Sequence, residues 1–246
     1  MARKERITYP GFYHIVNRGV EQRKIFLRDE DYDYFLDIVE NLKDKFNISI
    51  HAFCLMTNHY HILIKTNEQN ISQALKHLNL TYAKYFNYKY KRVGHLWQGR
   101  FHSTYLYDDI HCFDVAKYIE RNPIKARMVN EIIDYKYQSF YHWKTKGKYF
   151  KLLNNSIIFD MTLDEYEKYI KEEFETDIFD LIYKEPNIIK KDGNRKILYK
   201  RLKTFFDNDY DINRNINIKK AYDYGYRKSE IANYLNITSN SVVNIL

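Results

Sequence analysis

The sequence predicts an α+β fold, in which an antiparallel sheet carries helices and a helical region follows at the C-terminal end. Strand-like and helix-like segments alternate in the order β-α-β-β-α-β between residues 11 and 107, and a further helical segment follows. This order is that of the ferredoxin-like, split β-α-β plan, whose sheet is antiparallel. The chain after residue 145 is rich in charged helical pieces and ends in a pattern typical of a helix-turn-helix.

The individual elements follow from hydrophobic periodicity and from turn residues. Residues 11–17 alternate as a strand and run into a turn-like Asn-Arg-Gly sequence. Residues 29–46 carry an apolar stripe at helical spacing, with acidic residues in the first turn, which favours a helix. Thr57 and Asn58 separate two strand-like runs and predict a hairpin. The other expected elements are strands at 48–56, 60–65 and 101–107 and helices at about 72–88 and 109–122.

Composition divides the chain into three predicted parts. Residues 1–145 form the α+β domain, residues 146–212 a helical connector, and residues 213–246 a helix-turn-helix unit. Within the connector, Thr162 to Glu165 make a capping box that begins a helix reaching about residue 174. The other expected segments are helices at roughly 177–184 and 195–207 and a polar, Asn- and Asp-rich linker at 208–217.

The charge balance favours a polyanionic partner. The 246 residues include 40 lysines and arginines against 32 aspartates and glutamates, which gives a formal net charge of +8. Nucleic acid is the simplest such partner, although many soluble proteins carry a similar excess. The 25 tyrosines accompany abundant Lys, Asn and Ile and scarce Gly and Pro, a bias typical of AT-rich genes. A single tyrosine is therefore not evidence of function by itself.

The sequence lacks the features of membrane proteins, secreted proteins and zinc cages. No run approaches the ~20 apolar residues of a membrane span. The charged residues 1–6 contain no apolar segment typical of a signal peptide. Cys54 and Cys112 are too few for a disulfide framework or a zinc cage. We therefore expect a cytoplasmic, nucleoid-associated protein with reduced thiols and no membrane partner.

Two histidines at the predicted hairpin suggest a metal site. His59 and His61 are two residues apart, so in a strand both imidazoles leave the same face of the sheet. Two neutral imidazoles side by side supply half of a metal site. The same spacing also fits two structural histidines, so the hypothesis depends on a second segment of the chain.

The second segment is the helix expected to end near Pro123. Tyr118 and Asn122 are four residues apart, which places them within ~40° of one another on the helix surface. Pro123 disfavours helical geometry at Asn122, which puts the pair in the last turn. Two imidazoles and an amide oxygen would hold a metal with open positions for a phosphate oxygen, and the phenol would attack the polarised phosphodiester. The pair is also compatible with packing and a helix cap.

Three ordered motifs resemble those of a known family. Residues 55–61 contain the His–hydrophobic–His signature of the HUH endonucleases. Residues 94–101 (Gly-His-Leu-Trp-Gln-Gly-Arg-Phe) and 118–123 (Tyr-Ile-Glu-Arg-Asn-Pro) extend the similarity to the single-tyrosine HUH transposases. Among these, residues 7–145 most resemble the REP-associated tyrosine transposases, relatives of the smallest insertion-sequence transposases.

The resemblance implies a DNA-nicking and strand-transfer enzyme. Such an enzyme cuts single-stranded DNA near a hairpin, forms a 5′-phosphotyrosine link and leaves a free 3′-hydroxyl. By motif position, Tyr118 is the nucleophile, His59 and His61 are metal ligands, and Asn122 is the third ligand, where relatives carry Gln or Glu. The implied cofactor is a divalent metal, Mg²⁺ or Mn²⁺, although two imidazoles also suit Zn²⁺. Monomer and homodimer both stay open.

Cations mixed with aromatic side chains predict a surface for single-stranded or hairpin DNA. The expected contacts in the first domain are Arg18, Arg23, Lys84, Lys91, Arg92, Trp97, Arg100 and Arg121. The alternative is a solvated basic turn whose aromatic residues pack into the core. His14, His95 and His102 are expected to be structural or to face DNA rather than to bind a metal.

The last residues match the spacing of a helix-turn-helix. Ala232 takes its small-residue position, and Asn236 takes the turn position, because asparagine tolerates left-handed geometry. The other apolar positions then fall on Ile231, Leu235, Ile237, Val242 and Ile245. Ser229 would cap the first helix and Thr238 or Ser239 the second.

On this interpretation the second helix enters the major groove of duplex DNA. The residues expected to face the groove are Asn240, Ser241 and Asn244. The alternative is a helical hairpin used for packing or dimerisation.

Two other functions are compatible with the sequence. One is a non-catalytic, domesticated regulator that binds DNA through the helix-turn-helix. The other is a metal-dependent hydrolase that uses water, with Tyr118 in a structural role. The joint presence of His59, His61 and Tyr118 argues against the regulator, because the loss of any one would end the chemistry.

Overall fold

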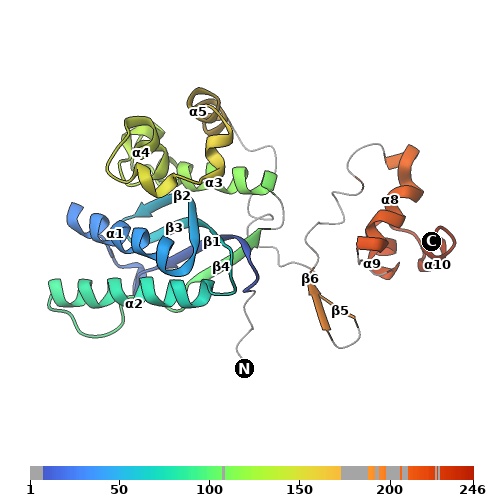
Figure 1. The fold of residues 1–246 in the computed structure, drawn as a ribbon, viewed down its shortest axis with the longest axis horizontal. Coiled ribbons are helices and arrows are strands. Elements are labelled where there is room, and N and C mark those ends of the chain that lie inside the picture. Colours follow the sequence, from blue (N-terminus) through green and yellow to red (C-terminus); the bar gives the residue numbers. More distant parts are fainter. Residues whose placement is uncertain are drawn as a thin grey trace. The chain divides into compact units, whose positions relative to one another are not determined.

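The computed structural model divides the chain into two compact units, residues 1–183 and 184–246 (Figure 1). The structure describes residues 8–106, 109–172, 188–191, 194–197, 206, 210–224, 226 and 228–246. Among the helices in these ranges, none has the length and apolar character needed to cross a membrane. Cys54 and Cys112 are both buried, and neither belongs to a disulfide.

The first unit contains the predicted order of elements. Its sheet consists of β1 (Gly11–Arg18), β2 (Ile48–Met56), β3 (His59–Thr66) and β4 (His102–Leu106). Its helices are α1 (Asp29–Phe46), α2 (Ile71–Lys89), α3 (Asp109–Lys125), α4 (Ser139–Thr145) and α5 (Leu163–Lys171). Short 3-10 turns are η1 (Val20–Gln22), η2 (Ile132–Asp134), η3 (Phe150–Leu153) and η4 (Ile157–Asp160). The predicted bounds of α1 and β2 are confirmed.

The sheet is antiparallel throughout, as predicted. Its strands pair in the order β2-β3-β1-β4. β1 and β2 therefore run in the same direction, with β3 between them. In the register of β1 with β3, Val16 lies opposite His61 and Arg18 opposite His59. The end of β1 is thus brought beside the two histidines.

Strand alternation gives the sheet two different faces. On one face, the Tyr60 ring lies 4.8 Å from that of Phe35 in α1, and its hydroxyl donates to Asn79 of α2. On the other face, His61 lies against Tyr118 of α3. α1 and α2 therefore cover one face of the sheet and α3 the other, with α4 and α5 on the same side as α3 (Figure 1).

Residues 146–171, the first part of the predicted connector, pack into the core of the first unit. Trp143 of α4 and the fully buried Tyr166 of α5 lie with their ring centroids 5.3 Å apart. Thr162 and Glu165 form the predicted capping box at the start of α5. This segment buries apolar side chains that a free connector would leave in water.

α3 continues through Pro123 to Lys125, so its predicted end at Asn122 is wrong. Proline lacks the N–H that would donate to the backbone oxygen of Ile119. The side-chain amide of Asn122 donates to the backbone oxygens of Tyr118, at 2.8 Å, and of Ile119, at 3.4 Å. This amide partly replaces the missing backbone donor, so the helix tolerates the proline.

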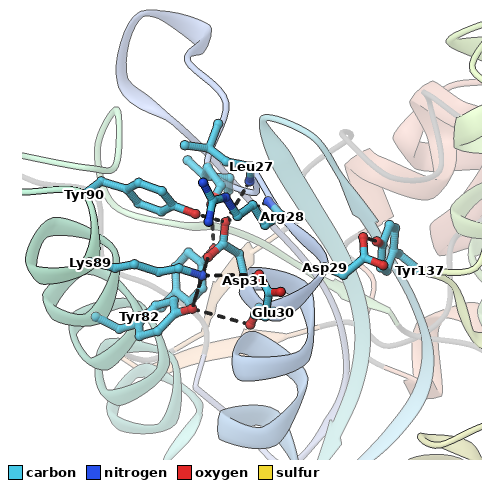
Figure 2. Close-up of polar contacts among 11 residues, drawn as sticks. Leu27, Arg28, Asp29, Glu30, Asp31, Tyr82, Lys89, Tyr90 and Tyr137 are labelled. Atoms are coloured by element: carbon cyan, nitrogen blue, oxygen red, sulfur yellow. Dashed lines mark hydrogen bonds and ion pairs between the residues drawn. The ribbon is translucent and has the colours of Figure 1, made fainter.

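A buried carboxylate ties the start of α1 to the end of α2 (Figure 2). Asp31 is fully buried and accepts hydrogen bonds from the backbone N–H groups of Leu27 and Arg28, at 2.8 and 3.0 Å. Lys89 and Tyr90 donate to it from the end of α2, both at 2.7 Å. Burial alone would raise the pKa of Asp31. The hydrogen bonds outweigh this effect and hold the pKa below its usual value.

The second unit, in its described part, contains a hairpin followed by helices. The elements are β5 (Ile188–Lys191), β6 (Asn194–Ile197), α8 (Tyr210–Tyr224), α9 (Lys228–Tyr234) and α10 (Ser239–Val243). The predicted helix at 195–207 is wrong at 195–197, because these residues pair with β5 in an antiparallel hairpin. The predicted helix at 177–184 lies outside the described residues.

The predicted linker at 208–217 is wrong from Tyr210, where α8 begins. Asn and Asp are poor helix formers, but the buried Ile218 and Ala221 of α8 pack into a small core. The burial of this apolar face stabilises the helix and outweighs the low helix propensity of the segment.

The apolar positions of the predicted helix-turn-helix meet in that small core. Its buried members are Phe206, Ile218, Ala221, Tyr226, Ile231, Ala232 and Val242, with Leu235, Ile237 and Ile245 packed against them. Asn236 has the left-handed φ of 52° expected at the turn, and Thr238 caps α10 through its hydroxyl. α9 begins at Lys228, so Ser229 lies inside its first turn instead of capping it. Binding of duplex DNA by these helices stays a prediction.

Candidate active site

His59 and His61 lie on the sheet face that α3 covers. They alternate with the core residue Tyr60, and their ring centroids are 5.0 Å apart with the planes at 79°. Their strand, β3, is paired on both sides, by β2 and by β1. The backbone under the two imidazoles is therefore rigid, as a metal-binding pair requires.

Each imidazole uses its Nδ1 for a hydrogen bond within the protein. His59 Nδ1 lies 2.6 Å from the side-chain oxygen of Asn58, and Asn58 in turn donates to the backbone oxygen of Gln22. His61 Nδ1 lies 3.0 Å from Nε2 of His14 in β1. In both rings this leaves Nε2 as the nitrogen for a ligand. A second hydrogen bond at the far nitrogen is typical of metal-binding histidines.

Burial keeps these histidines neutral. Burial lowers the pKa of His59 to about 4, with a smaller contribution from the positive charge of Arg18. Burial, and then the neighbouring His14 and His59, hold the pKa of His61 well below its usual value. Burial also lowers the pKa of His14 to about 3. Neutral imidazoles keep a lone pair, so at pH 7 both His59 and His61 are able to bind a metal.

The Tyr118 ring lies edge-on to His61 and His14. Its ring centroid is 5.7 Å from that of His61 and 5.9 Å from that of His14, with the planes at 83° and 82°. The ammonium group of Lys125, one turn beyond Asn122 on α3, lies 4.7 Å from the centre of the Tyr118 ring. Burial lowers the pKa of Lys125, and Arg121 lowers it further. The structure thus brings the phenol and the cation of α3 beside the imidazoles of His14 in β1 and His61 in β3.

Asn122 is held by its own helix. Its amide nitrogen donates to the backbone oxygen of Tyr118, which leaves the side-chain oxygen for another partner. The assignment of nitrogen and oxygen here follows from this hydrogen bond. Among the described residues, no hydrogen bond or ring contact joins Asn122 to His59 or His61. Its role as third ligand stays a prediction.

The donor set fits a metal that keeps open positions. Among the described residues, no group of three or more His, Cys, Asp or Glu side chains is arranged to hold a metal ion. The site instead offers Nε2 of His59 and Nε2 of His61, with the Asn122 oxygen as the proposed addition. An N₂O set suits Mn²⁺ and other transition metals better than Mg²⁺, which prefers oxygen ligands. Such a set leaves room for a substrate oxygen.

A groove of about 640 Å³ lies beside α2 and the loop before β4. It is lined by the predicted contacts Lys84, Trp97 and Arg100, and by the polar residues Asn79, Asn87 and Gln98. Lys84 and Arg100 are exposed, whereas Trp97 is half-buried and donates through Nε1 to the backbone oxygen of Asn79 at 2.8 Å. The Trp97 side chain is therefore held in place at the side of the groove, and the exposed side chains of Lys84 and Arg100 can contact a ligand.

Backbone contacts connect this groove to the histidines. Gln98 donates its backbone N–H to the oxygen of Arg18 at 3.0 Å, and Gly19 pairs with Trp97 in an isolated bridge. Arg18 is itself opposite His59 in the sheet. The predicted contact Arg18 therefore lies between the groove and the candidate metal site.

Three other predicted contacts are Arg23, Arg92 and Lys91, of which the first two have protein partners. Arg23 forms an ion pair with the exposed Glu21 at 3.1 Å. Arg92 donates to the side-chain oxygen of Asn87 at 3.2 Å, at the edge of the groove. Lys91 is exposed and has a left-handed φ of 50°. None of these three cations lines the groove.

The remaining predicted contacts lie elsewhere. Arg121 donates to two backbone oxygens at the C-terminal end of α5, at 2.8 and 3.0 Å, and so fastens α5 to α3. In the second unit, Asn240 and Asn244 are exposed. The Ser241 hydroxyl lies 2.9 Å from that of Thr238 at the start of α10. Their roles toward DNA stay predictions.

Two residues at the site have contacts that the sequence did not predict. Asn79 is a buried hub whose side-chain oxygen accepts hydrogen bonds from Asn17 and Tyr60, which joins α2 to β1 and β3. His14 was expected to be structural or to face DNA, yet it contacts His61 directly. The alternation of the first strand places His14 on one face, but only the register with β3 shows that this face is the one with His61.

Residues 8–122 match the model of a protein family described as Transposase IS200 like. The first unit resembles the IS200-like transposases. All the residues of the candidate metal–tyrosine site, from His14 to Asn122, fall inside this transposase-like region, and the match ends at Asn122. α4, α5 and the second unit lie beyond it.

Two individual proteins support the transposase resemblance. A putative REP-associated tyrosine transposase of Haemophilus influenzae is 25% identical over 136 residues, which cover 48% of this chain and 77% of the relative. A solved REP-associated tyrosine transposase, bound to a REP hairpin, superposes with a TM-score of 0.50 at 18% identity. That superposition covers 60% of this chain and 87% of the other. The superposition shows a shared fold, which in this chain is an α+β arrangement with an antiparallel sheet.

Proposed function

We propose that this protein is a metal-dependent endonuclease and strand transferase that nicks single-stranded DNA near a hairpin and becomes linked to it through Tyr118. The approach of the Tyr118 and His61 rings, 5.7 Å apart, carries the proposal. The two residues come from segments 57 positions apart, and their motifs resemble the nucleophile and ligand motifs of HUH transposases. A purely structural tyrosine would not need the neutral imidazole of His61, whose Nδ1 is hydrogen-bonded within the protein, beside it.

The reaction is a transfer of one ester bond to another. The phenol oxygen of Tyr118 attacks phosphorus, a new O–P bond forms, and the bond from phosphorus to the 3′-oxygen breaks. The phenol gives up a proton and the leaving 3′-oxygen gains one, which yields a 5′-phosphotyrosine and a free 3′-hydroxyl. Because an ester is exchanged rather than hydrolysed, the 3′-hydroxyl of another strand can later reverse the step.

The residues around Tyr118 have separate roles in this step. His59, His61 and the Asn122 oxygen would hold Mn²⁺ or Mg²⁺, which when bound polarises the phosphate as a Lewis acid. The Lys125 ammonium over the ring stabilises negative charge as it develops on the phenol. The Tyr118 side chain is buried, with an exposed fraction of 7%, which limits the access of water that would compete with it for phosphorus.

The proposed DNA path runs from the groove to Tyr118. Lys84 and Arg100 would neutralise phosphates in the groove, and Arg18 would continue the positive charge toward His59. The half-buried ring of Trp97 offers a surface on which an unpaired base can stack. A solved relative bound to a hairpin is consistent with a hairpin as the substrate.

Trapping of the covalent adduct tests this proposal. The full chain is incubated with 5′- or 3′-labelled hairpin oligonucleotides from the flanks of its gene, with Mn²⁺ or with EDTA, and run on a denaturing protein gel. We expect an adduct that carries the 3′ label, a released 5′-labelled fragment, and neither product in EDTA. Cleavage without an adduct would instead support a hydrolase that uses water. Binding without cleavage would support the regulator.

The groove gives a further prediction about binding. Lys84→Gln should lower the slope of log affinity against log salt by about 0.7, because one phosphate contact with a single strand is lost. The measurement is fluorescence anisotropy of a labelled hairpin in EDTA at several salt concentrations. The matched control is Lys76→Gln, an exposed lysine on the same helix outside the groove. Equal slopes for the two variants would exclude the groove as the binding surface.

The second unit is proposed to bind duplex DNA through α10. The left-handed turn at Asn236, the Thr238 cap and the exposed Asn240 and Asn244 favour a helix-turn-helix over a simple packing hairpin. This activity would be shared by the transposase and by the non-catalytic regulator. Only the adduct experiment separates those two functions.

A further inference from the structure

We propose that His14 is a positioning residue for the metal site, and that it accepts a hydrogen bond from Nδ1–H of His61. This acceptor fixes the tautomer in which Nε2 of His61 is unprotonated and free to bind a metal. The inference rests on the proposed function only for the identity of the bound group. The hydrogen bond itself is a property of the metal-free chain.

The geometry of the two rings favours a directional hydrogen bond. His14 Nε2 and His61 Nδ1 are 3.0 Å apart, while the ring centroids are 5.2 Å apart and the planes differ by only 9°. The nitrogens are much closer than the ring centres, so the bond lies near the plane of both rings. This direction is the one in which an imidazole donates and accepts.

The position of His14 in the sheet brings its ring within reach of His61. In the β1–β3 register, His61 lies opposite Val16, two residues along from His14 on the same face. Such diagonal neighbours are within reach of ring side chains. Both rings are buried, with exposed fractions of 0% for His14 and 4% for His61. Val16, directly opposite His61, is apolar, so it cannot replace His14 as a side-chain acceptor for Nδ1 of His61.

The other nitrogen of His14 leaves its tautomer adjustable. Among the described residues, His14 Nδ1 is buried and has no hydrogen-bond partner. No other contact therefore dictates which nitrogen of His14 carries the proton. The ring can place its proton on Nδ1 and present Nε2 as an acceptor to His61. His14 would then accept the hydrogen bond that a carboxylate or a backbone carbonyl accepts from many metal-binding histidines.

The partner of His59 is an amide, Asn58, whereas the partner of His61 is the histidine His14. Asn58 presents an oxygen to His59 Nδ1, and an amide oxygen can only accept. His59 is thereby held in the same tautomer that we propose for His61. The two ligands would share one arrangement, with Nδ1–H directed into the protein and Nε2 directed to the metal.

The first test measures the tautomer without any metal. Long-range ¹H–¹⁵N correlation spectra of the full chain, labelled at histidine, distinguish protonated from unprotonated ring nitrogens. We expect His61 to carry its proton on Nδ1 in the wild type and on Nε2 in His14→Leu, because the Nε2–H form is preferred when no acceptor is present. A wild-type His61 that already carries its proton on Nε2 would overturn the proposal.

The second test measures Mn²⁺ affinity by titration calorimetry on the same folded chains. His14→Leu should bind Mn²⁺ about 10- to 100-fold more weakly, the usual cost of losing such a partner. His14→Gln should recover most of the affinity, because its side-chain oxygen can accept from His61. His142→Leu, which removes another buried histidine, on α4, should bind Mn²⁺ like the wild type.

The outcomes separate this inference from the proposed function. Equal Mn²⁺ affinity in wild type and His14→Leu would refute the positioning role while leaving the metal site intact. Mn²⁺ binding that persists in His59→Ala and His61→Ala would refute the proposed metal site itself. In that case the tautomer spectra still decide whether His14 accepts from His61.

Discussion

Tyr118→Phe is expected to abolish the covalent protein–DNA adduct, with cleavage reduced by at least about 10⁴-fold, while hairpin binding stays unchanged. The substitution removes one oxygen atom, the proposed nucleophile. It keeps the ring that packs against His61, His14 and Lys125. The variant should therefore fold normally and bind Mn²⁺ normally. Adduct yield on a denaturing gel and hairpin affinity in EDTA are the two measurements.

The matched control is Tyr141→Phe. Tyr141 is a partly buried tyrosine of α4, and its ring contacts His142 rather than the candidate site. It should form the adduct at the wild-type rate. If cleavage survives in Tyr118→Phe with an adduct, another tyrosine is the nucleophile. If it survives without one, water is the nucleophile and Tyr118 is structural.

Asp31→Asn is expected to lower the free energy of unfolding by about 3 kcal/mol at pH 7. Breaking a buried ion pair costs about 3–5 kcal/mol, and the lower end applies because the Lys89 side chain is 25% exposed and can be partly hydrated. An amide has only one oxygen, so either the donors at Oδ2 (Leu27, Arg28 and Tyr90) or those at Oδ1 (Tyr85 and Lys89) lose their acceptor. Urea unfolding of the full chain measures the effect, since the first unit holds this network.

The pH dependence of this effect has a definite sign. The pKa of Asp31 is held below its usual value in the folded protein. Its stabilisation is therefore fully present above the unfolded pKa of about 3.9, and it is lost as the pH falls through the folded pKa. The difference between wild type and Asp31→Asn should be constant from pH 8 to about pH 5 and should shrink only below about pH 4.

Asp33→Asn is the control on the same helix. Asp33 pairs with Lys148 at 3.1 Å, but both side chains are about half exposed. An exposed ion pair contributes about 0–1 kcal/mol, so this variant should be close to the wild type at every pH. An equal loss in both variants would mean that the helix start, rather than the buried carboxylate, is sensitive to charge.

The candidate site could be predicted from the sequence only in part. His59 and His61 are adjacent in one strand, and Tyr118 and Asn122 are adjacent on one helix, so local periodicity suffices to pair each set. The proximity of the two sets follows from the motif resemblance and not from local rules. The roles of His14 and Asn79 could not be foreseen, because each depends on which residues of β1 and β3 lie side by side.

Two of the wrong predictions, the end of α3 and the linker at 208–217, have a common cause. The local backbone preference of Pro123 predicts the end of a helix. The preference of the Asn- and Asp-rich segment from residue 208 predicts a linker. In the folded chain the side-chain amide of Asn122 donates to the backbone oxygens of Tyr118 and Ile119. Burial of Ile218 stabilises α8. Both are side-chain contributions that local propensity does not contain.

The sequence by itself determined the order of the elements, the bounds of α1 and β2 and the common face of His59 and His61. These are consequences of periods of 3.6 and 2 residues, which any short segment expresses alone. Only the tertiary structure decided that residues 146–171 complete the first unit, that Trp97 forms a wall of a basic groove, and that His14 stands behind His61. Those contacts join residues far apart in the chain. They therefore form only when the strands pair in this register and the helices pack on these faces of the sheet.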